Sequence, residues 1–386
     1  MIFCLTVHHM TASPRNNRPT LRMIAKEAGL SVAATSMALR NHPRISAETR
    51  KHVQAVACRM GYHPDPKLAT LMQHLRTHGN GNYRETLMYL STYSSFEDWK
   101  TAPHYDYYLG AAERALDLGY RLDVIHLGEP GMTAARISHL LAVRGVRGIL
   151  IGGFEEPESS LALDWKQFAA VAFDYSLISP RLHRVTTNYY LEMSSVLRRL
   201  AEEGCQRIGL NANSNDDAKV MGLWHSAFLY FEENIPPSCR VKVNFFPNGK
   251  SKLAPWLRRY KPDAIISAGY ADFPQDYEEI YGESPPEDIR YVNMNIAYTD
   301  GRSRGVDKLQ NIVGRRACEH LIALLQQNEV GLPVHPQVIV IEGEWVENYT
   351  AWKIDRENWR ANACQKIAAF TEVSDPQIQI DRVAVG

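Results

Sequence analysis

Apolar positions near the N-terminus recur at the spacing of short helices. Thr20 can cap a first helix, and one face of that helix is apolar: Leu21, Ile24, Ala25 and Ala28. Gly29 supplies a tight turn, and Ser31 can cap the helix that follows. Helices this short are marginal alone, so a further helix has to cover them. The pattern predicts a small helical domain.

The covering helix is predicted over residues 47–60. Ser46 is its cap, Gly61 ends it, and Val53 and Val56 belong to its apolar stripe. Two helices joined by a tight turn and covered by a third form a helix-turn-helix, whose second helix enters the major groove of DNA. The alternative is a small helical domain that binds protein or nothing.

A break follows this domain. The run YHPDP at 62–66 stops the third helix, and KLATLMQHLR at 67–76 has Leu68, Leu71 and Leu75 on one side of a short helix. Unaided, such a helix is marginal and could be a linker. The Gly/Asn-rich stretch after Arg76 marks the boundary to the rest of the chain.

From Thr86 onward, short apolar runs alternate with longer helical patterns. Strands are predicted at 86–90, 122–127, 148–151, 171–173, 208–210, 264–267 and 291–293. Helices are predicted at 107–118, 133–143, 192–203, 221–233 and 312–326. This alternation predicts doubly wound parallel sheets, with enough repeats for two lobes. Past Trp352 the chain continues; Trp352 and Trp359 can pack on the body, and the last dozen residues are expected to fray.

Charge is unevenly distributed although the formal net charge is zero. Residues 15–78 hold eleven Lys and Arg against three Asp and Glu, a net charge of +8, and residues 79–386 carry −8. A basic N-terminal head on an acidic body suits a DNA-binding protein with a regulatory domain, because phosphate attraction stays local to the head.

Other classes of protein lack support in the sequence. The six cysteines are scattered without zinc spacing, which predicts free thiols in a reducing cytoplasm and no bound metal. No apolar run reaches the length of a membrane span, and the opening MIFCLTV lacks the basic region of a signal peptide. No GxSxG, HExxH or GxGxxG motif is present, so neither catalytic residues nor a cofactor are predicted.

The head resembles that of the LacI/GalR family of bacterial transcription regulators. The resemblance rests on TL at 20–21, IA at 24–25, AGLS at 28–31, HPRIS at 42–46, TR at 49–50 and GYHP at 61–64. It implies base contacts from Val32, Ala33 and Met37, which are apolar and suit thymine methyl groups and DNA shape rather than hydrogen-bonded bases. It implies phosphate contacts from Thr20, Ser31, Thr35, Ser36, Arg40, Asn41, Arg44, Ser46 and Thr49. For Thr20 and Ser46, helix capping is the competing role.

The same resemblance gives roles to the hinge and the body. Leu71 matches the leucine that such hinge helices insert into the minor groove, which kinks the duplex. The body resembles a type I periplasmic-binding-protein fold, whose ligands lie between the lobes at the carboxyl ends of the strands. The effector candidates there are Tyr93, Trp99, Tyr105, Tyr108, Phe154, Asp174, Asn213, Lys219, Tyr270 and Asn295.

Three candidates depart from the family pattern. Lys219 stands where an Arg is usual, Tyr270 belongs to a pair that is usually Asn-Asp, and Asn295 replaces an Asp. The sequence therefore predicts a pocket that keeps aromatic residues and loses charge. Either the ligand is unusual or the site is degenerate.

The expected protein is an α/β chain with an all-α helix-turn-helix head, a hinge helix and a two-lobed parallel-sheet effector domain. Its expected parts are a disordered leader over 1–18, the head over 19–64, hinge and linker over 65–85, the effector domain over 86–351 and an extension over 352–386. We expect a cytoplasmic homodimer that represses from a pseudo-palindromic DNA operator under control of a small molecule, a sugar. The alternatives are a regulator with a ligand-independent cleft and, against the basic head, a solute-binding protein.

Overall fold

The computed structural model describes residues 19–39, 42, 44–60, 62, 85–246, 253–286, 288–299 and 301–374. The predicted leader, the hinge helix with Leu71, and Arg40 and Asn41 lie outside these residues. Contacts divide the chain into two compact units, one containing the N-terminal helices and one containing residues 73–325 and 330–386. Within the described residues, no helix is long and apolar enough to cross a membrane.

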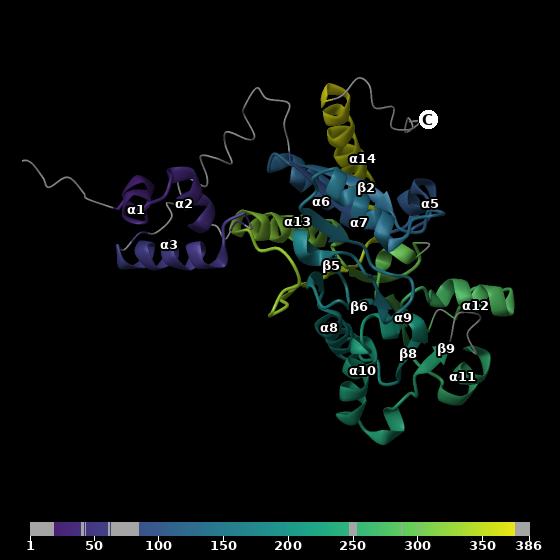
Figure 1. Ribbon diagram of the computed structural model, residues 1–386. Helices are drawn as coiled ribbons and strands as arrows, with labels where there is room; N and C mark the ends of the chain where they lie inside the picture. Colours follow the sequence, from purple (N-terminus) through teal and green to yellow (C-terminus); the bar gives the residue numbers. More distant parts are fainter. Residues whose placement is uncertain are drawn as a thin grey trace, which may run out of the picture. The chain divides into compact units, whose positions relative to one another are not determined.

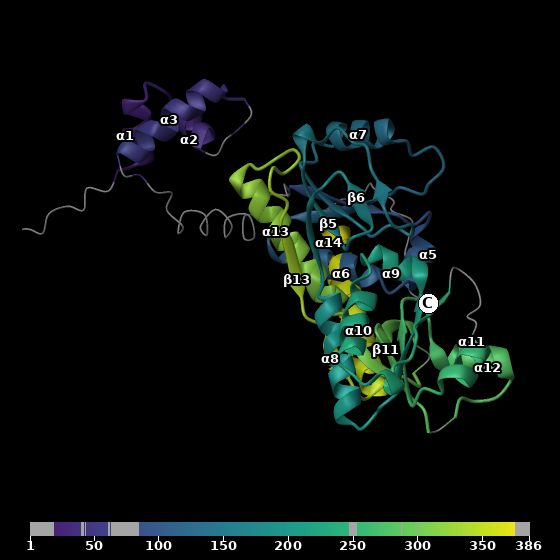
Figure 2. The same ribbon diagram turned by 90° about the horizontal axis from the view of Figure 1, so that it is seen from below.

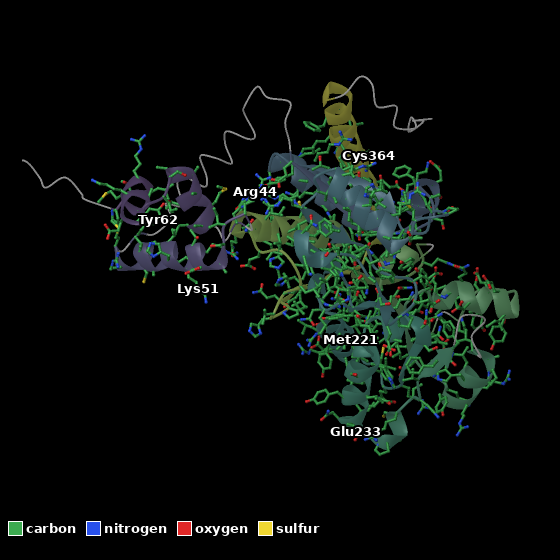
Figure 3. The ribbon with its side chains drawn as sticks, in the orientation of Figure 1. Arg44, Lys51, Tyr62, Met221, Glu233 and Cys364 are labelled. Carbon is green, nitrogen blue, oxygen red and sulfur yellow. The ribbon has the colours of Figure 1, made fainter. Side chains whose placement is uncertain are left out.

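The N-terminal unit is a cluster of three helices, α1 (Leu21–Glu27), α2 (Val32–Leu39) and α3 (Ala47–Arg59) (Figure 1). Ile24, Ala38 and Val53 are completely buried at its centre, one from each helix. The predicted covering helix is therefore present, and its burial supplies the stability that the two shorter helices lack. Lys51 extends from α3 away from this core (Figure 3).

The larger unit contains two lobes, each built on a six-stranded sheet. In the N-terminal lobe all neighbouring strands are parallel. Their order is β13 (Val338–Ile341), β7 (His183–Thr187), β5 (Ala169–Phe173), β3 (Gly148–Ile151), β1 (Thr86–Ser91) and β2 (Arg121–His126). The other elements of this lobe are α5 (Phe96–Thr101), α6 (Tyr105–Asp117), α7 (Ala134–Val143), β4 (Ser159–Ser160), the 3-10 turn Trp165–Gln167, β6 (Leu177–Ser179) and α13 (Gln310–Gln327).

The C-terminal lobe repeats this plan with one antiparallel edge strand, β14. Its order is β14 (Glu344–Val346), β12 (Arg304–Asp307), β11 (Arg290–Asn293), β10 (Ala264–Ala268), β8 (Ile208–Asn213) and β9 (Asn244–Phe246). Its helices are α8 (Tyr189–Glu202), α9 (Ser214–Lys219), α10 (Leu223–Glu233), α11 (Leu253–Tyr260) and α12 (Phe273–Tyr281), with 3-10 turns at Pro237–Cys239 and Ile296–Tyr298. Helices α8 and α10 lie side by side in both ribbon views (Figures 1 and 2).

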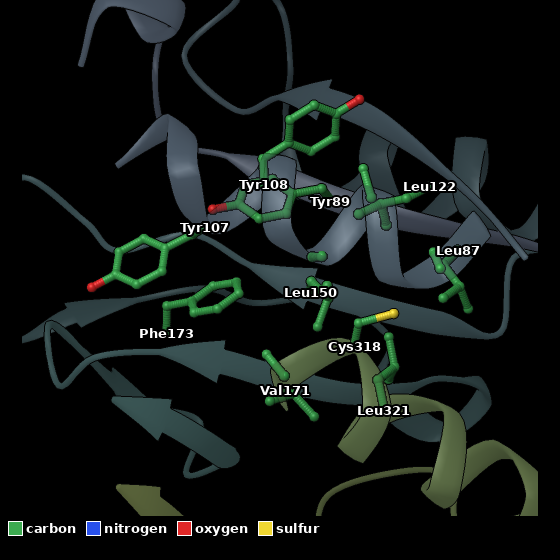
Figure 4. Close-up of a cluster of buried hydrophobic side chains, with 14 of the residues drawn as sticks. Leu87, Tyr89, Tyr107, Tyr108, Leu122, Leu150, Val171, Phe173, Cys318 and Leu321 are labelled. Carbon is green, nitrogen blue, oxygen red and sulfur yellow. The ribbon is translucent and has the colours of Figure 1, made fainter. Parts of the chain in front are cut away.

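The core of the N-terminal lobe joins its sheet to α6 and α13. Tyr107 of α6 stacks on Phe173 of β5 with ring centroids 4.9 Å apart, and Cys318 of α13 belongs to the same cluster (Figure 4). The two helices cross closely because each has a glycine at the contact. A Cβ atom at Gly110 would lie 2.0 Å from the carbonyl oxygen of Asn311, so any larger residue there would push the helices apart.

The last described element is a long helix, α14 (Tyr349–Ser374), which lies beside α6 (Figures 1 and 2). Cys364 lies on it (Figure 3). At its start the Trp352 indole donates to Asp307 at the end of β12, 2.6 Å away. Farther along, Arg356 and Arg360 donate to Asp106 of α6. The helix thus bonds to both lobes, and the domain boundary predicted at residue 351 falls inside it.

The predicted fold class is confirmed: parallel strands alternate with helices in two lobes, which follow a helix-turn-helix unit along the chain. The helix predicted from residue 221 begins at Leu223, because Met221 and Gly222 have φ angles of 59° and 67°, outside the helical range. Apart from the long helix α14, the helices and strands without a sequence prediction are mostly short or partly exposed: α5, α9, α11, α12, β4, β6, β7, β9, β12, β13 and β14.

Candidate functional site

Helix α2 presents an apolar tip to solvent. Ser31 caps it, with its Oγ accepting from the Ala34 amide at 3.1 Å. Val32 is 42% exposed, Ala33 is exposed, and Met37 is half-buried. The side chains predicted to meet bases are thus accessible at the start of this helix and along it, and none can make a bidentate hydrogen bond.

One predicted phosphate contact is corrected. Thr35 is completely buried, and its hydroxyl donates to the Ser31 carbonyl at 2.9 Å. The helical period places Thr35 on the same inward face as Ala38, which is also buried, so its side chain stabilises the head instead of reaching DNA.

The other polar candidates of the head lie near its surface. Thr20 accepts from the Met23 amide at 3.4 Å, and Ser46 accepts from the Thr49 amide at 3.1 Å, so both cap helices as expected. Ser46 and Thr49 also share a hydrogen bond between hydroxyls 2.7 Å apart. Arg44 is exposed and Ser36 half-buried. Their contacts with phosphates remain predictions.

A cavity of about 260 Å³ lies at the carboxyl ends of strands from both lobes. The N-terminal lobe lines it with residues that follow β1, β3 and β5, and the C-terminal lobe with residues that follow β8, β10, β11 and β12. Ligands of open parallel sheets bind at this edge because the strand ends and the following loops converge there. Of the predicted effector residues, the cavity wall includes Tyr93, Phe154, Asp174, Lys219, Tyr270 and Asn295.

The other four predicted effector residues do not line the cavity. Trp99, Tyr105 and Tyr108 are buried in an aromatic cluster, with the Trp99 ring 5.1 Å from that of Tyr105 and 5.0 Å from that of Tyr108. The rotation of α5 and α6 turns these rings into the core of the lobe. Asn213 caps α9 instead, because its Oδ1 accepts from the amides of Asn215 and Asp216.

Asp174 is the most heavily hydrogen-bonded group of the N-terminal wall. Its Oδ1 accepts from Tyr189 at 2.7 Å and from Thr186 at 2.8 Å, and its Oδ2 accepts from Tyr107 at 3.2 Å. Burial, followed by the charge of Asp174, raises the pKa of Tyr107 and of Tyr189 well above the ordinary value of tyrosine. Both phenols therefore stay neutral donors, and because Tyr189 begins α8 of the C-terminal lobe, its bond to Asp174 joins the two lobes.

The opposite wall contains a second charged group. Lys219 donates to Asp216 at 2.9 Å, and the other oxygen of Asp216 accepts from the amide of Tyr270 at 2.8 Å. The Lys219 ammonium also lies 5.4 Å from the centre of the Tyr270 ring. The expectation that the pocket loses charge is wrong, because Asp216 and the lysines keep charge on this side.

His104 is a cavity residue that the sequence did not reveal. Its Nδ1 lies 3.3 Å from the Tyr93 hydroxyl and 3.4 Å from the Tyr298 hydroxyl. Tyr298 belongs to the C-terminal lobe, so this imidazole links the two lobes. Burial lowers the pKa of His104, which keeps the ring neutral. It sits just before α6, in a loop without periodicity.

Lys308 is the other missed residue. It is 4% exposed, and its Nζ lies 4.1 Å from the centre of the Tyr189 ring and 4.5 Å from that of Trp224. All three residues line the cavity. Burial lowers the pKa of Lys308, and Glu192 opposes that shift. Lys308 directly follows strand β12, and a prediction of that strand would have placed it in the cavity. The strand has only four residues and could not be predicted from the sequence.

The family model for bacterial regulatory proteins of the lacI family matches residues 20–65. The helix-turn-helix head of this chain matches the LacI family. The matched residues include α1, α2 and α3, so the match identifies the helix-turn-helix as the DNA-binding part of a bacterial regulatory protein. Comparison with curated proteins gives no match.

Solved structures similar to this chain support the fold of its body. A transcriptional regulator CelR in complex with cellobiose is 18% identical with a TM-score of 0.52, over 86% of this chain and 99% of that one. A LacI-family regulator from Rhizobium etli is 16% identical with a TM-score of 0.53, over 68% of this chain and 97% of that one. A transcription regulator-like protein from Staphylococcus haemolyticus is 14% identical with a TM-score of 0.52, over 69% and 98%.

Proposed function

We propose that this regulator acts in the cytoplasm as a homodimer on a pseudo-palindromic operator, as a repressor whose DNA affinity depends on a small molecule in the cavity between the lobes. Two heads related by a twofold axis need half-sites about one helical turn apart, which accounts for the palindrome. We further propose that the small molecule is a carbohydrate.

The cavity is the observation that carries the proposal. Its walls come from both lobes, so a molecule bound there contacts both and stabilises one arrangement of the lobes. Aromatic faces from Tyr93, Phe154 and Tyr270 suit the apolar face of a sugar ring. Carboxylate, amide and lysine groups suit its hydroxyls. The cellobiose complex of CelR, which shares this fold, supports the choice of ligand class.

The head contributes affinity and sequence preference through different residues. Exposed cations such as Arg44 attract phosphates at any sequence, and the apolar tip of α2 packs against thymine methyl groups. Binding of the small molecule changes operator affinity by a coupling free energy that is typically about 1–3 kcal/mol.

Selection of bound duplexes from random DNA by the purified full-length protein tests the DNA half of the proposal. We expect a pseudo-palindrome with thymine-rich half-sites and an affinity that falls steeply with salt. A selected sequence without twofold symmetry would contradict the dimeric mode of binding.

Calorimetry of the same protein with a panel of neutral and acidic sugars tests the effector half. Binding of one sugar, together with a change in operator affinity in its presence, is the expected result. A folded protein that binds no member of the panel would instead support a ligand-independent regulator.

Variants of the head separate the two kinds of contact. Arg44→Ala should weaken binding at all sequences alike and reduce the slope of log affinity against log salt by about one. Lys166→Ala removes the same charge from an exposed position of the body and serves as the matched control. A loss confined to one operator sequence would refute the phosphate role.

A further inference from the structure

One cation in the cavity has no partner of its own. Lys308 is 4% exposed, yet within the described residues its ammonium makes neither a hydrogen bond nor an ion pair. Its immediate neighbours are the ring faces of Tyr189 and Trp224. Aromatic faces attract a cation but accept no conventional hydrogen bond, so the donors of a buried ammonium remain free.

A second free donor belongs to the same wall. The Nε1 atom of Trp224 is buried and has no hydrogen-bond partner within the described residues. Trp224 is itself 4% exposed and lines the cavity next to Lys308. Buried polar groups in folded proteins are normally paired, so two neighbouring unpaired donors indicate a missing acceptor. The acceptor that fits a positive charge is an anionic oxygen.

The nearby carboxylates do not fill this role. Asp216 is bonded to Lys219 and Asp174 to three hydroxyls. Glu192 interacts with Lys308 electrostatically but lines a separate hollow beside Gly343. Burial raises the pKa of Glu192 and lowers that of Lys308, and the charge of each group opposes the shift of the other, but the two groups share no hydrogen bond or ion pair within the described residues. Lys219, by contrast with Lys308, already has its counter-ion.

The rest of the cavity limits the charge of the ligand. Asp98, Glu155, Asp174 and Asp216 all line it, and four carboxylates oppose a group that carries two negative charges. One ligand carboxylate can pair with Lys308, the unpaired cation among the described residues of the cavity. Hydroxyls elsewhere on the ligand can donate to the four carboxylates of the cavity. A sugar phosphate brings a second negative charge without a second free cation.

We propose that the effector is a sugar acid with one carboxylate, held by Lys308 and Trp224. The inference rests on the proposed sugar-regulated function and deepens it. Lys308 sets the preference for acid over neutral sugars, and the aromatic side chains and carboxylates that line the cavity bind the sugar ring.

Calorimetry of the full-length protein with matched sugar pairs tests the inference. The pairs are D-glucuronate with D-glucose and D-galacturonate with D-galactose, which differ only at C6, and glucose 6-phosphate is the doubly charged comparison. We expect at least one acid to bind at least about tenfold more tightly than its neutral partner, a difference of about 1.4 kcal/mol. Glucose 6-phosphate should bind more weakly than glucuronate.

Variants at residue 308 test the role of the lysine. Lys308→Met keeps most of the side-chain length and removes the charge, so it should bring the acid and its neutral partner within about threefold of each other. Lys308→Arg keeps the charge and should retain a preference for the acid. Thermal melting of each variant establishes that it is folded, and the wild-type comparison stands even if a variant does not fold.

Several results would overturn the inference. Neutral sugars that bind wild type as tightly as their acids would refute it and leave the sugar-regulated function intact. Tightest binding of glucose 6-phosphate would refute the single-charge argument, and an unchanged preference in folded Lys308→Met would refute the role of Lys308. Absence of binding by every sugar would refute the inference together with the sugar-regulated function.

Discussion

His104 joins the two lobes through a neutral imidazole. Its Nδ1 is within hydrogen-bond distance of Tyr93 from one lobe and near Tyr298 from the other. Because burial is the main reason for its lowered pKa, protonation would place an unsolvated charge between the walls of the cavity. Burial therefore opposes protonation of this ring in the folded protein.

We predict a pH-dependent stability from His104. Its folded-state pKa lies below the usual 6.5, so between these two values the unfolded chain binds more protons than the folded one. The free energy of unfolding should therefore fall as the pH drops below about 6.5. Urea titrations of wild type and His104→Asn from pH 5 to 8 isolate this contribution, since the other histidines are common to both. The prediction would be contradicted if the free energies of unfolding of wild type and His104→Asn changed in parallel with pH.

A second prediction at this scale concerns the apolar tip of α2. Met37→Ala should lower affinity for the selected operator by about 1 kcal/mol, because thymine methyl contacts are lost, and leave binding to random DNA nearly unchanged. Fluorescence anisotropy on both duplexes measures the two effects. Equal losses on both would assign Met37 to the fold of the head rather than to base contacts.

Helix α14 is attached to the body by hydrogen bonds along its length. Trp352 bonds to the end of β12, Arg356 and Arg360 enclose Asp106, and Lys366 donates to Asp117 at 2.7 Å. Asp106 is 3% exposed, so its two arginines supply the charge compensation that burial requires. The helix therefore fixes the start of α6, the helix that His104 precedes.

We predict that Asp106→Asn destabilises the body by about 3 kcal/mol, because it leaves two partly buried arginines without their carboxylate. Chemical denaturation monitored by tryptophan fluorescence measures the change. Glu357→Gln, which removes the partner of Lys353 in an exposed ion pair of the same helix, should cost less than about 0.5 kcal/mol. A loss no larger than that of this control would show that α14 is only loosely attached.

The sequence predicted helices and strands that are buried through apolar residues better than those held in place by ion pairs. Strands with continuous apolar residues, such as β3 at 148–151, match the structure because burial on both faces leaves a clear pattern. Helix α14 escaped prediction because Arg356, Arg360 and Lys366 face acidic partners on α6 that are distant in sequence. In the hydrophobic pattern of a sequence, a charged residue predicts a solvent-facing position unless its ionic partner is known.

The candidate site shows the same limit. Tyr93 and Asp174 could be predicted because they follow recognisable strands. Lys308 could not, since β12 spans only Arg304–Asp307, and Trp99 was misplaced because helical rotation decides which side of α5 meets the core. Placement at a strand end is readable from periodicity, whereas the direction of a side chain on a short helix depends on packing.

At the scale of the whole molecule, the proposed function requires coupling between the ligand site and the operator site. We predict that the effector changes operator affinity about 5- to 150-fold, the range of typical coupling energies. Operator titrations with and without saturating sugar measure the factor, and the neutral partner of the preferred sugar is the control. A factor of one with a sugar that binds tightly would contradict control by the cavity.

The N-terminal lobe is built from two separate segments of the chain, and this determines the order in which the two lobes can fold during synthesis on the ribosome. The C-terminal lobe is nearly continuous between α8 and β12, whereas the N-terminal lobe needs α13 and β13, which are made after it. Until α13 emerges, Leu87 and Leu150 lack the cover of Leu321 and its neighbours (Figure 4). A message that ends before residue 310 would therefore yield a head able to fold on its own, attached to a lobe with an open core and prone to aggregate.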